Sequence, residues 1–509
     1  MKTGLFKMML LLCLTIGLAQ LKTLAQSTIV QTKYGKVEGS TEENIRIYKG
    51  IPFAAPPVGN LRWRPPQPPS SWTGVKKTIS FSASPIQTKP VPFLCWSAEF
   101  IAPPSPLSED CLYLNVWTGA SSSKEKRPVF VWIYGGGFSS GSAACAIYDG
   151  KNYAKKGVVF VSINYRVGAL GFMASRELTK EGHGSSGNYG LMDQVAALKW
   201  VNENIAAFGG DPSNITIGGQ SAGSMSVNAL IASPAAAGLF QRAIAESGGL
   251  LGEIKPASLA EGEKTGQALQ EKLGSTSLNE MRALPADSIL SGSQGLANLS
   301  FSPIRDGIFL PADLEKALTG GKFNQVGFLG GWVLDDAVLI HPSKATPEEF
   351  IKMMNETYGK KAEKLLILLP HDSEEQASAS LKTMNLIYFG ALSPYKLSKY
   401  NSKPCYIYEF AHVPAEKPGF PDYGVFHTSE VPYALNTLHL WDRPWTALDL
   451  SIENNMSSYW INFIRSGNPN GPGLEKWEPY RTGFSLEIGD TIQGKNDQYK
   501  NILEVLASD

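Results

Sequence analysis

A lone serine stands among small residues where an apolar segment ends, in the stretch "NITIGGQSAGS" (214–224). Glycine is costly inside regular structure, and serine prefers water or a helix cap. The stretch makes sense if Ser221 stands on a sharp turn with its hydroxyl free. Residues 219–223 fit the G-x-S-x-G nucleophile elbow, with a strand pattern before them and a helix pattern after them. The motif predicts Ser221 as a nucleophile, and a purely structural turn is the alternative interpretation.

A second glycine-rich segment lies upstream, where the apolar run "WIYGGGF" (132–138) reaches Gly135, Gly136 and Gly137. A neutral serine needs a base, an orienting acid and hydrogen-bond donors for the oxyanion that its attack creates. Three glycines let backbone N–H groups approach a ligand closely, and such a donor loop is expected upstream of an elbow. We therefore favour an oxyanion-binding loop over a merely flexible one.

The elements that must position these groups can be read from the hydrophobic pattern. Short β-branched runs at 112–117, 129–134 and 158–166 predict buried strands, and apolar residues at helical spacing over 191–208 predict a helix. Strands separated by helices imply right-handed crossovers, and so an α/β fold with a large, mostly parallel, twisted sheet flanked by helices. We interpret residues 26–509 as one domain, with the lysine- and glutamate-rich segment at about 250–400 as a helical elaboration over the active-site gorge.

The composition and the N-terminal residues limit the possible binding partners and the location of the protein. The chain has 509 residues, 43% of them hydrophobic, and a net charge of zero, so no basic face predicts nucleic-acid binding. Lys2 and Lys7 precede an apolar run at 8–19, and Thr23 and Ala25 are small residues at the spacing that a signal peptidase recognises. Residues 1–25 are therefore predicted to be a signal peptide of a secreted or periplasmic protein. A membrane anchor is the alternative, but the run is too short to span comfortably.

Export makes disulfides possible, and the mature chain keeps four cysteines. Cys95 and Cys111 flank a proline-rich loop, and a bridge between them would close about 15 residues and contribute roughly 3 kcal/mol. Cys405 lies in an alternating strand pattern and is expected to be a buried apolar group. Cys145 receives no role.

Several segments together carry a family resemblance: "EDCLYLNVW", "WIYGGGF", "NYRVGALGF", the block at 187–224 and "FHTSEVPYA". With them the chain resembles the type B carboxylesterases, the cholinesterase-like branch of the α/β-hydrolases, and in particular their bacterial secreted members. The similarity extends over the whole mature chain. The resemblance implies an α/β-hydrolase fold, a triad in the order serine, acid, histidine, and no metal or organic cofactor.

The resemblance places the triad on Ser221, Asp336 and His427. His427 lies in "FHTSEVPY", which matches the family's histidine loop, and Asp336 lies in "GWVLDDA" (331–337). The family most often has glutamate at the acid, and Val333 and Ala337 stand where it has asparagine and glycine. Aspartate can orient an imidazole but reaches one methylene less, so the loop must sit differently. The neighbouring Asp335 remains the alternative.

The resemblance also implies the supporting residues. The oxyanion donors would be the backbone N–H groups of Gly136, Gly137 and Ala222. Ser247, in "AESGG", would be a supporting serine near the acid, and Cys95 and Cys111 match the family's first disulfide.

The substrate is argued from what the family's choline ester hydrolases carry. They have a glutamate before the serine and an aromatic cation platform in the first disulfide loop, whereas this chain has Gln220 and Ile101. We therefore expect poor choline ester turnover. Apolar residues around the acid, from Trp332 to Leu334, suggest an apolar pocket wall and small or medium neutral esters, alkyl or aryl. A non-catalytic adhesion ectodomain and a lipase on longer acyl chains are the alternatives.

Overall fold

The computed structural model describes residues 27–508 apart from 251–254, 297–299, 337 and 339–342. The predicted signal peptide and Ala337 therefore lie outside the described residues. Within the described ranges, no helix has the length and apolarity needed to cross a membrane.

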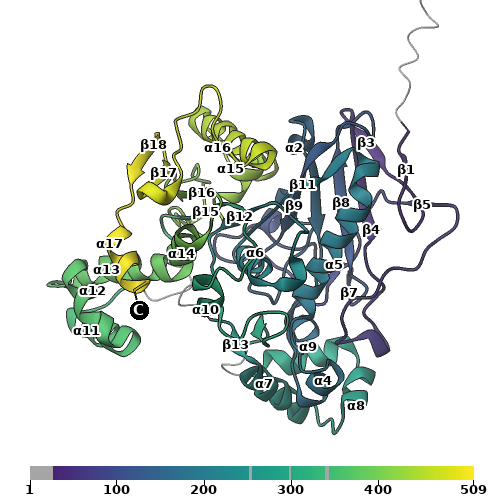
Figure 1. The fold of residues 1–509 in the computed structure, drawn as a ribbon, viewed down its shortest axis with the longest axis horizontal. Helices are drawn as coiled ribbons and strands as arrows, with labels where there is room; N and C mark the ends of the chain where they lie inside the picture. The colour runs from purple at the N-terminus through teal and green to yellow at the C-terminus, as the bar shows by residue number, and fades with distance from the viewer. Residues whose placement is uncertain (1–26, 251–254, 297–299, 337, 339–342, 509) are drawn as a thin grey trace, which may run out of the picture.

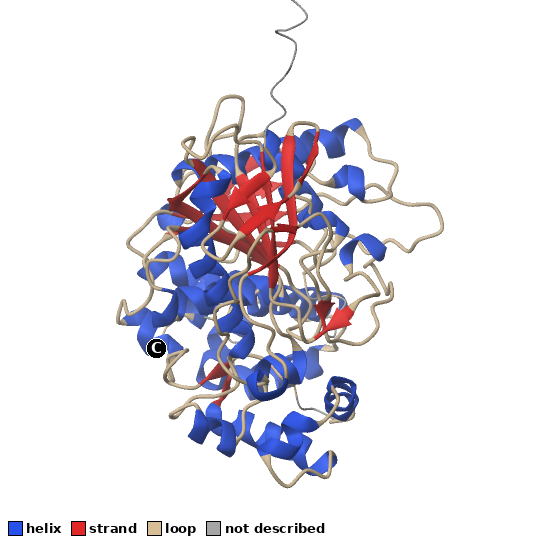
Figure 2. Cartoon of the chain, turned by 90° about the vertical axis from the view of Figure 1, so that its right-hand side faces the viewer, coloured by secondary structure: helices blue, strands red, loops and turns tan. Residues whose placement is uncertain are grey.

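The chain is built around one large mixed sheet (Figures 1 and 2). In the described residues the sheet has eleven strands, in the order β18-β17-β16-β15-β12-β11-β9-β10-β8-β4-β3. Their bounds are β3 Ser40–Glu42, β4 Ile45–Pro52, β8 Tyr113–Thr118, β9 Arg127–Ile133, β10 Val159–Ile163, β11 Gly210–Gln220, β12 Arg242–Glu246, β15 Gly327–Val333, β16 Cys405–Phe410, β17 Phe484–Ile488 and β18 Ile492–Asn496. The central strands from β10 to β17 are parallel, and the pairs at the two flanks are antiparallel. The parallel centre agrees with the sheet predicted from the short apolar runs.

Helices cover this sheet on both sides (Figure 2). The long ones are α5 Tyr189–Asn204, α6 Ala222–Ala232, α7 Leu259–Lys272, α9 Ala286–Gln294, α11 Pro347–Tyr358, α13 Glu374–Leu386, α14 Leu392–Tyr400 and α16 Ala447–Ser466. The shorter ones are α2 Lys151–Lys155, α3 Gly168–Phe172, α4 Arg176–Glu181, α8 Leu278–Ala283, α10 Leu314–Thr319, α12 Ala362–Leu368, α15 Val431–Leu435 and α17 Lys500–Leu506. Small sheets lie outside the main one and consist of β1 Ile29–Gln31, β2 Lys36–Glu38, β5 Val75–Lys77, β6 Ser84–Pro85, β7 Leu107–Ser108, β13 Ala257–Ser258 and β14 Ile304–Arg305.

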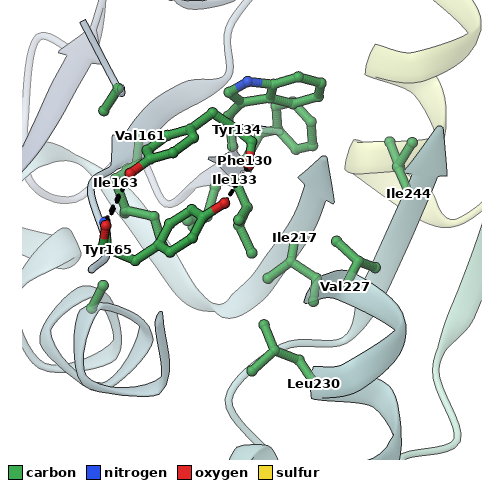
Figure 3. Close-up of a cluster of buried hydrophobic side chains, with 14 of the residues drawn as sticks. Phe130, Ile133, Tyr134, Val161, Ile163, Tyr165, Ile217, Val227, Leu230 and Ile244 are labelled. Carbon is green, nitrogen blue, oxygen red and sulfur yellow. Dashed lines mark hydrogen bonds between the residues drawn. The ribbon is translucent and has the colours of Figure 1, made fainter. Parts of the chain in front are cut away.

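The core that supports the site lies where β9, β10 and β11 meet α6 (Figure 3). Ile133, Ile217 and Leu230 from these elements are fully buried. Directly after β9 and β10, the rings of Tyr134 and Tyr165 stack with centroids 4.4 Å apart, and each hydroxyl donates to the other residue's backbone carbonyl, at 3.0 and 2.9 Å. This reciprocal pair fixes the chain where the glycine loop begins.

The segment at 250–400 is mostly helical, as predicted, but it is not only an elaboration. Strand β15, in the middle of the sheet, lies within it, and the hydrophobic pattern missed this strand together with β12, β17 and β18. Glycines at 327, 330 and 331 obscure the strand pattern of β15 because glycine is depleted in strands. The structure needs at least one of them, since a Cβ on Gly331 would clash with the backbone oxygen of Tyr408 on β16.

Candidate active site

Ser221 lies on a strained turn between β11 and α6. Its φ of 58° and ψ of −126° lie in a region that residues with a side chain rarely occupy. The turn is held by its backbone N–H, which donates to the carbonyl oxygens of Glu246 and Ser247 at 3.0 Å each. Gly219 is needed because a Cβ there would lie 2.5 Å from the carbonyl oxygen of Ile133. The spacing of the motif is thus a consequence of β9 packing directly against the turn.

The glycine loop lies beside this turn. A Cβ on Gly135 would come within 2.9 Å of the Ser221 Cβ, so only glycine allows this approach. Gly136 and Gly137 have φ of 115° and 60°, and in the described residues no hydrogen bond from either backbone N–H is recorded. Ala222 is the first residue of α6, so its N–H has no acceptor within the helix. Among the residues that the structure describes, none of the three amides predicted to bind an oxyanion donates a hydrogen bond that would compete with a ligand.

The structure brings together two of the predicted triad residues from positions 91 apart in the chain. His427 Nδ1 lies 2.6 Å from Asp336 Oδ1, and both side chains are buried. Burial by itself lowers the pKa of His427, but the charge of Asp336 and the hydrogen bond to it outweigh burial, so this pKa is raised above its ordinary value. The arrangement suits a histidine that accepts a proton on its other nitrogen while Asp336 stabilises the cation.

The neighbouring acid, Asp335, has a different role. Its carboxylate accepts a hydrogen bond from the backbone N–H of Val425 at 2.9 Å, and its own N–H donates to the Val425 carbonyl at 3.2 Å. Asp335 thus fastens the histidine loop to the end of β15 through the backbone. Of the two acids that the sequence left open, Asp336 is the one whose carboxylate contacts His427.

The Ser221 hydroxyl has no recorded hydrogen bond to His427, although both residues are among those described. The side chain of Gln220 lies against the imidazole instead, with Nε2 at 3.3 Å from Nδ1 and 3.2 Å from Nε2 of His427. Nearly equal distances to both ring nitrogens place the amide over the ring face. Catalytic hydrogen bonds are often long without substrate and tighten in the complex, so the geometry is compatible with a serine–histidine pair.

Ser247, expected as a supporting serine near the acid, hydrogen-bonds a different carboxylate. Its hydroxyl donates to Glu430 Oε1 at 3.1 Å, and its N–H donates to the carbonyl of Gly331 at 2.9 Å. Glu430 follows His427 by three residues, in the quoted segment "FHTSEVPY", where its acidic side chain was the available signal. The sequence analysis gave Glu430 no role.

The apolar wall predicted around the acid is also placed differently. Trp332 and Val333 are buried in the core, where the Trp332 indole N–H donates to Glu409, and Leu334 is exposed. Aromatic rings from elsewhere approach the histidine instead: the edge contacts of Phe389 and Trp96 put their centroids 5.1 and 6.4 Å from the His427 ring. These side chains are far apart in sequence, so the hydrophobic pattern could not associate them with the site.

Phe389 belongs to a π-helical turn, Ile387–Ala391, which joins α13 to α14. A Cβ on the next residue, Gly390, would lie only 3.5 Å from Asp336 Oδ2, so this turn packs directly over the acid. Such turns are frequent at functional sites. The helical segment therefore does reach the candidate site, through this turn.

The expected disulfide is not formed in the structure. Cys95 and Cys111 are both buried, free thiols. Burial raises the pKa of both thiols, that of Cys95 to about 12. Cys405 is buried in β16, as predicted.

Comparison with known proteins shows the family to which this chain belongs. Residues 26–504 match the model of the carboxylesterase family. The chain is 34% identical over 490 residues to the para-nitrobenzyl esterase of Bacillus subtilis (strain 168), covering 92% of this chain and 96% of that protein. It is 33% identical to the fumonisin B1 esterase of Sphingopyxis macrogoltabida, with 91% and 86% covered.

The similarity to solved structures supports the same family. A PNB esterase structure has a TM-score of 0.82 at 32% identity and covers 94% of this chain and 99% of its own. A thermophilic PNB esterase has a TM-score of 0.81, also at 32% identity, and covers 94% of this chain and 100% of its own. The α/β-hydrolase fold, the strained serine turn and the match along nearly the whole chain lead to one conclusion: this protein is an ester-hydrolysing enzyme of the carboxylesterase family.

Proposed function

We propose that the enzyme cleaves carboxylic esters with Ser221 as nucleophile, His427 as general base and Asp336 as the orienting acid. The observation that carries this proposal is the 2.6 Å contact between His427 Nδ1 and Asp336, which is buried and adjoins the strained serine turn. Asp336 holds the proton on Nδ1, which leaves Nε2 to accept the Ser221 proton.

The reaction has two halves. Ser221 Oγ attacks the ester carbonyl as its proton passes to His427, and the N–H groups of Gly136, Gly137 and Ala222 stabilise the oxyanion. His427 then protonates the departing alcohol. A water molecule, deprotonated by the same histidine, cleaves the acyl-serine and restores the free hydroxyl.

For substrate we propose small to medium neutral esters, alkyl or aryl. The rings of Phe389 and Trp96 at the histidine provide apolar surface, and the amide of Gln220 adds no negative charge. The relatives are named for different esters, para-nitrobenzyl and fumonisin B1 among them, so similarity alone does not select a substrate.

We also propose that the protein is exported and that residues 1–25 are removed. The support is the basic start, the apolar run and the small residues at the expected cleavage position. N-terminal sequencing of the protein recovered from the periplasm or medium should begin at Gln26, and a start at Met1 would contradict export by cleavage.

The test of the catalytic proposal is kcat/KM on p-nitrophenyl esters from acetate to laurate. Ser221→Ala should lower kcat by at least about 10⁴-fold on every ester, because removing a triad serine removes the nucleophile. Ser213→Ala makes the same change on an exposed serine at the other end of β11 and should match the wild type.

The chain-length profile decides between substrate classes. A maximum at short or medium acyl chains fits the proposal, and a preference for emulsified long-chain lipids would favour a lipase instead. A wild type as inactive as Ser221→Ala on the whole series would support the non-catalytic binding protein.

A further inference from the structure

Two buried glutamates lie behind the His427–Asp336 pair and take no part in the proposed reaction. Glu246 ends β12, and its backbone carbonyl accepts the N–H of Ser221. Glu430 directly precedes α15, three residues after His427. Both side chains are completely buried. Ser247, directly after Glu246, links the two elements, because its hydroxyl donates to Glu430 Oε1 at 3.1 Å.

Each of these carboxylates has little to stabilise a negative charge. Glu430 Oε1 accepts from the Ser247 hydroxyl at 3.1 Å, and Glu246 Oε1 accepts from the Trp460 indole N–H at 2.8 Å. Over the described part of the chain, the Oε2 atom of each glutamate is buried without a hydrogen-bond partner, and no lysine or arginine forms an ion pair with either. Glu430 also gains from a backbone hydrogen bond, but a few neutral donors do not compensate for burying two charges.

The charged groups that face the two glutamates are Asp336, which adds negative charge, and His427, whose cation favours the charged form of Glu430. Asp336 and His427 lie on the site side, and Asp336 Oδ2 is a further buried oxygen without a partner in the described residues. On the other sides lie the neutral hydroxyl groups of three tyrosines: Tyr148, Tyr153 of α2 and Tyr408 of β16.

The protonation of the pair follows from this geometry. Burial raises the pKa of Glu246 to about 8 and also that of Glu430, for which the negative charges of Glu246 and Asp336 add to the effect of burial. Because neighbouring buried carboxyls titrate together, the protons belong to the pair and not to either residue.

We propose that Glu246 and Glu430 hold one proton between them at neutral pH and act as positioning residues for the His427–Asp336 pair. The shared proton limits the pair to one negative charge. That charge lies behind the histidine and favours its protonated form, while a second charge would favour the cation too strongly for His427 to release its proton. Whether the pair holds a proton depends only on the fold, whereas the effect of the pair on His427 rests on the proposed catalytic function.

The first experiment counts the proton without using activity. A carboxyl whose folded pKa is raised above its unfolded value keeps its proton in the folded state alone between about pH 5 and 8. Folding stability therefore falls as pH rises through this window, and the unfolding constant increases about tenfold per pH unit for each such proton. The measurement is urea unfolding of the wild type, Glu246→Gln, Glu430→Gln and the double variant from pH 5.5 to 7.5.

Glutamine has the shape of the protonated acid and does not titrate. If the pair holds one proton, the double variant should lose one tenfold step per pH unit relative to the wild type, and each single variant should lose at most that step, because its remaining carboxyl can take the proton. A wild-type slope in the double variant would mean that no proton is held, and the loss of two steps there would mean two independent protons; either result overturns the proposal. Glu363→Gln, on the exposed side of α12, is the matched control and should keep the wild-type slope.

The second experiment tests the effect on the histidine. The acidic limb of kcat/KM against pH, measured with p-nitrophenyl acetate, reports the free enzyme's base. The wild-type pair keeps one negative charge and the double variant has none, so the midpoint of this limb should fall by roughly one pH unit in the double variant relative to the wild type, as expected for a nearby buried charge. An unchanged midpoint would overturn the positioning role.

The two proposals fail in different ways. If Ser221→Ala retained full activity, the catalytic assignment would fail while the unfolding slopes stood. If Ser221→Ala abolished activity but the pH slope of unfolding in the double glutamate variant matched that of the wild type, only the proposal of the shared proton would fail.

Discussion

Replacing Asp336 by asparagine removes one negative charge from a buried contact of the site and changes little else in shape. The carboxylate oxygen lies 2.6 Å from His427 Nδ1. With charge centres about 4 Å apart and an effective dielectric of about 20, the lost attraction to the histidine cation is about 4 kcal/mol, or roughly 10³-fold in rate. An asparagine NH₂ directed at Nδ1 would also favour the tautomer with its proton on Nε2, which cannot accept from Ser221. We therefore expect kcat/KM to fall by about 10³- to 10⁴-fold.

The assay is kcat/KM on p-nitrophenyl butyrate for Asp336→Asn and for its matched control, Asp335→Asn. The control makes the same change one residue earlier, at a carboxylate that binds the backbone of Val425 and not the histidine. It should stay within about tenfold of the wild type, because a hydrogen bond to a charged group contributes about 1.5–3 kcal/mol and an asparagine oxygen can retain part of it. Equal losses in both variants, or a loss below tenfold in Asp336→Asn, would refute the assignment of the acid.

Three further outcomes are expected. Gln220→Glu places a carboxylate against the His427 ring, so the midpoint of the acidic limb of kcat/KM should rise by about one pH unit or more; a fall would contradict the contact seen at 3.2 Å. Because the wild type has an uncharged amide there, kcat/KM for butyrylcholine should be lower than for a neutral butyrate ester, and equal values would remove the argument from charge. Gly219→Ala pushes a Cβ against the carbonyl of Ile133 and should lower the free energy of unfolding, measured in urea melts, by about 1–3 kcal/mol or more. The control is Gly327→Ala, whose Cβ would meet its nearest atom at 3.4 Å. Equal stability of the two variants would count against the packing argument.

The parts of the site that depend on a few consecutive residues were predictable from sequence. The serine turn and the glycine loop each need small residues at fixed spacing because another strand passes close to them. The glycines that meet this need are visible as short motifs in the sequence. The resemblance to type B carboxylesterases added the histidine loop and narrowed the acid to two neighbours. Strand β15 was missed because the glycines that let it pack against β16 are the residues that weaken a strand pattern.

What the sequence by itself determined is therefore local: a serine on a strained turn, a glycine loop beside it and the strands that lead to both. Only the tertiary structure decided which partners meet. Asp335 and Asp336 are adjacent and chemically identical, yet one reaches the backbone of Val425 and the other the imidazole of His427. The same is true of Glu246 and Glu430, which are remote in sequence and are both completely buried behind the site. The path of the chain sets distance and solvent exposure between remote residues, and these two quantities control the strength of a charge interaction.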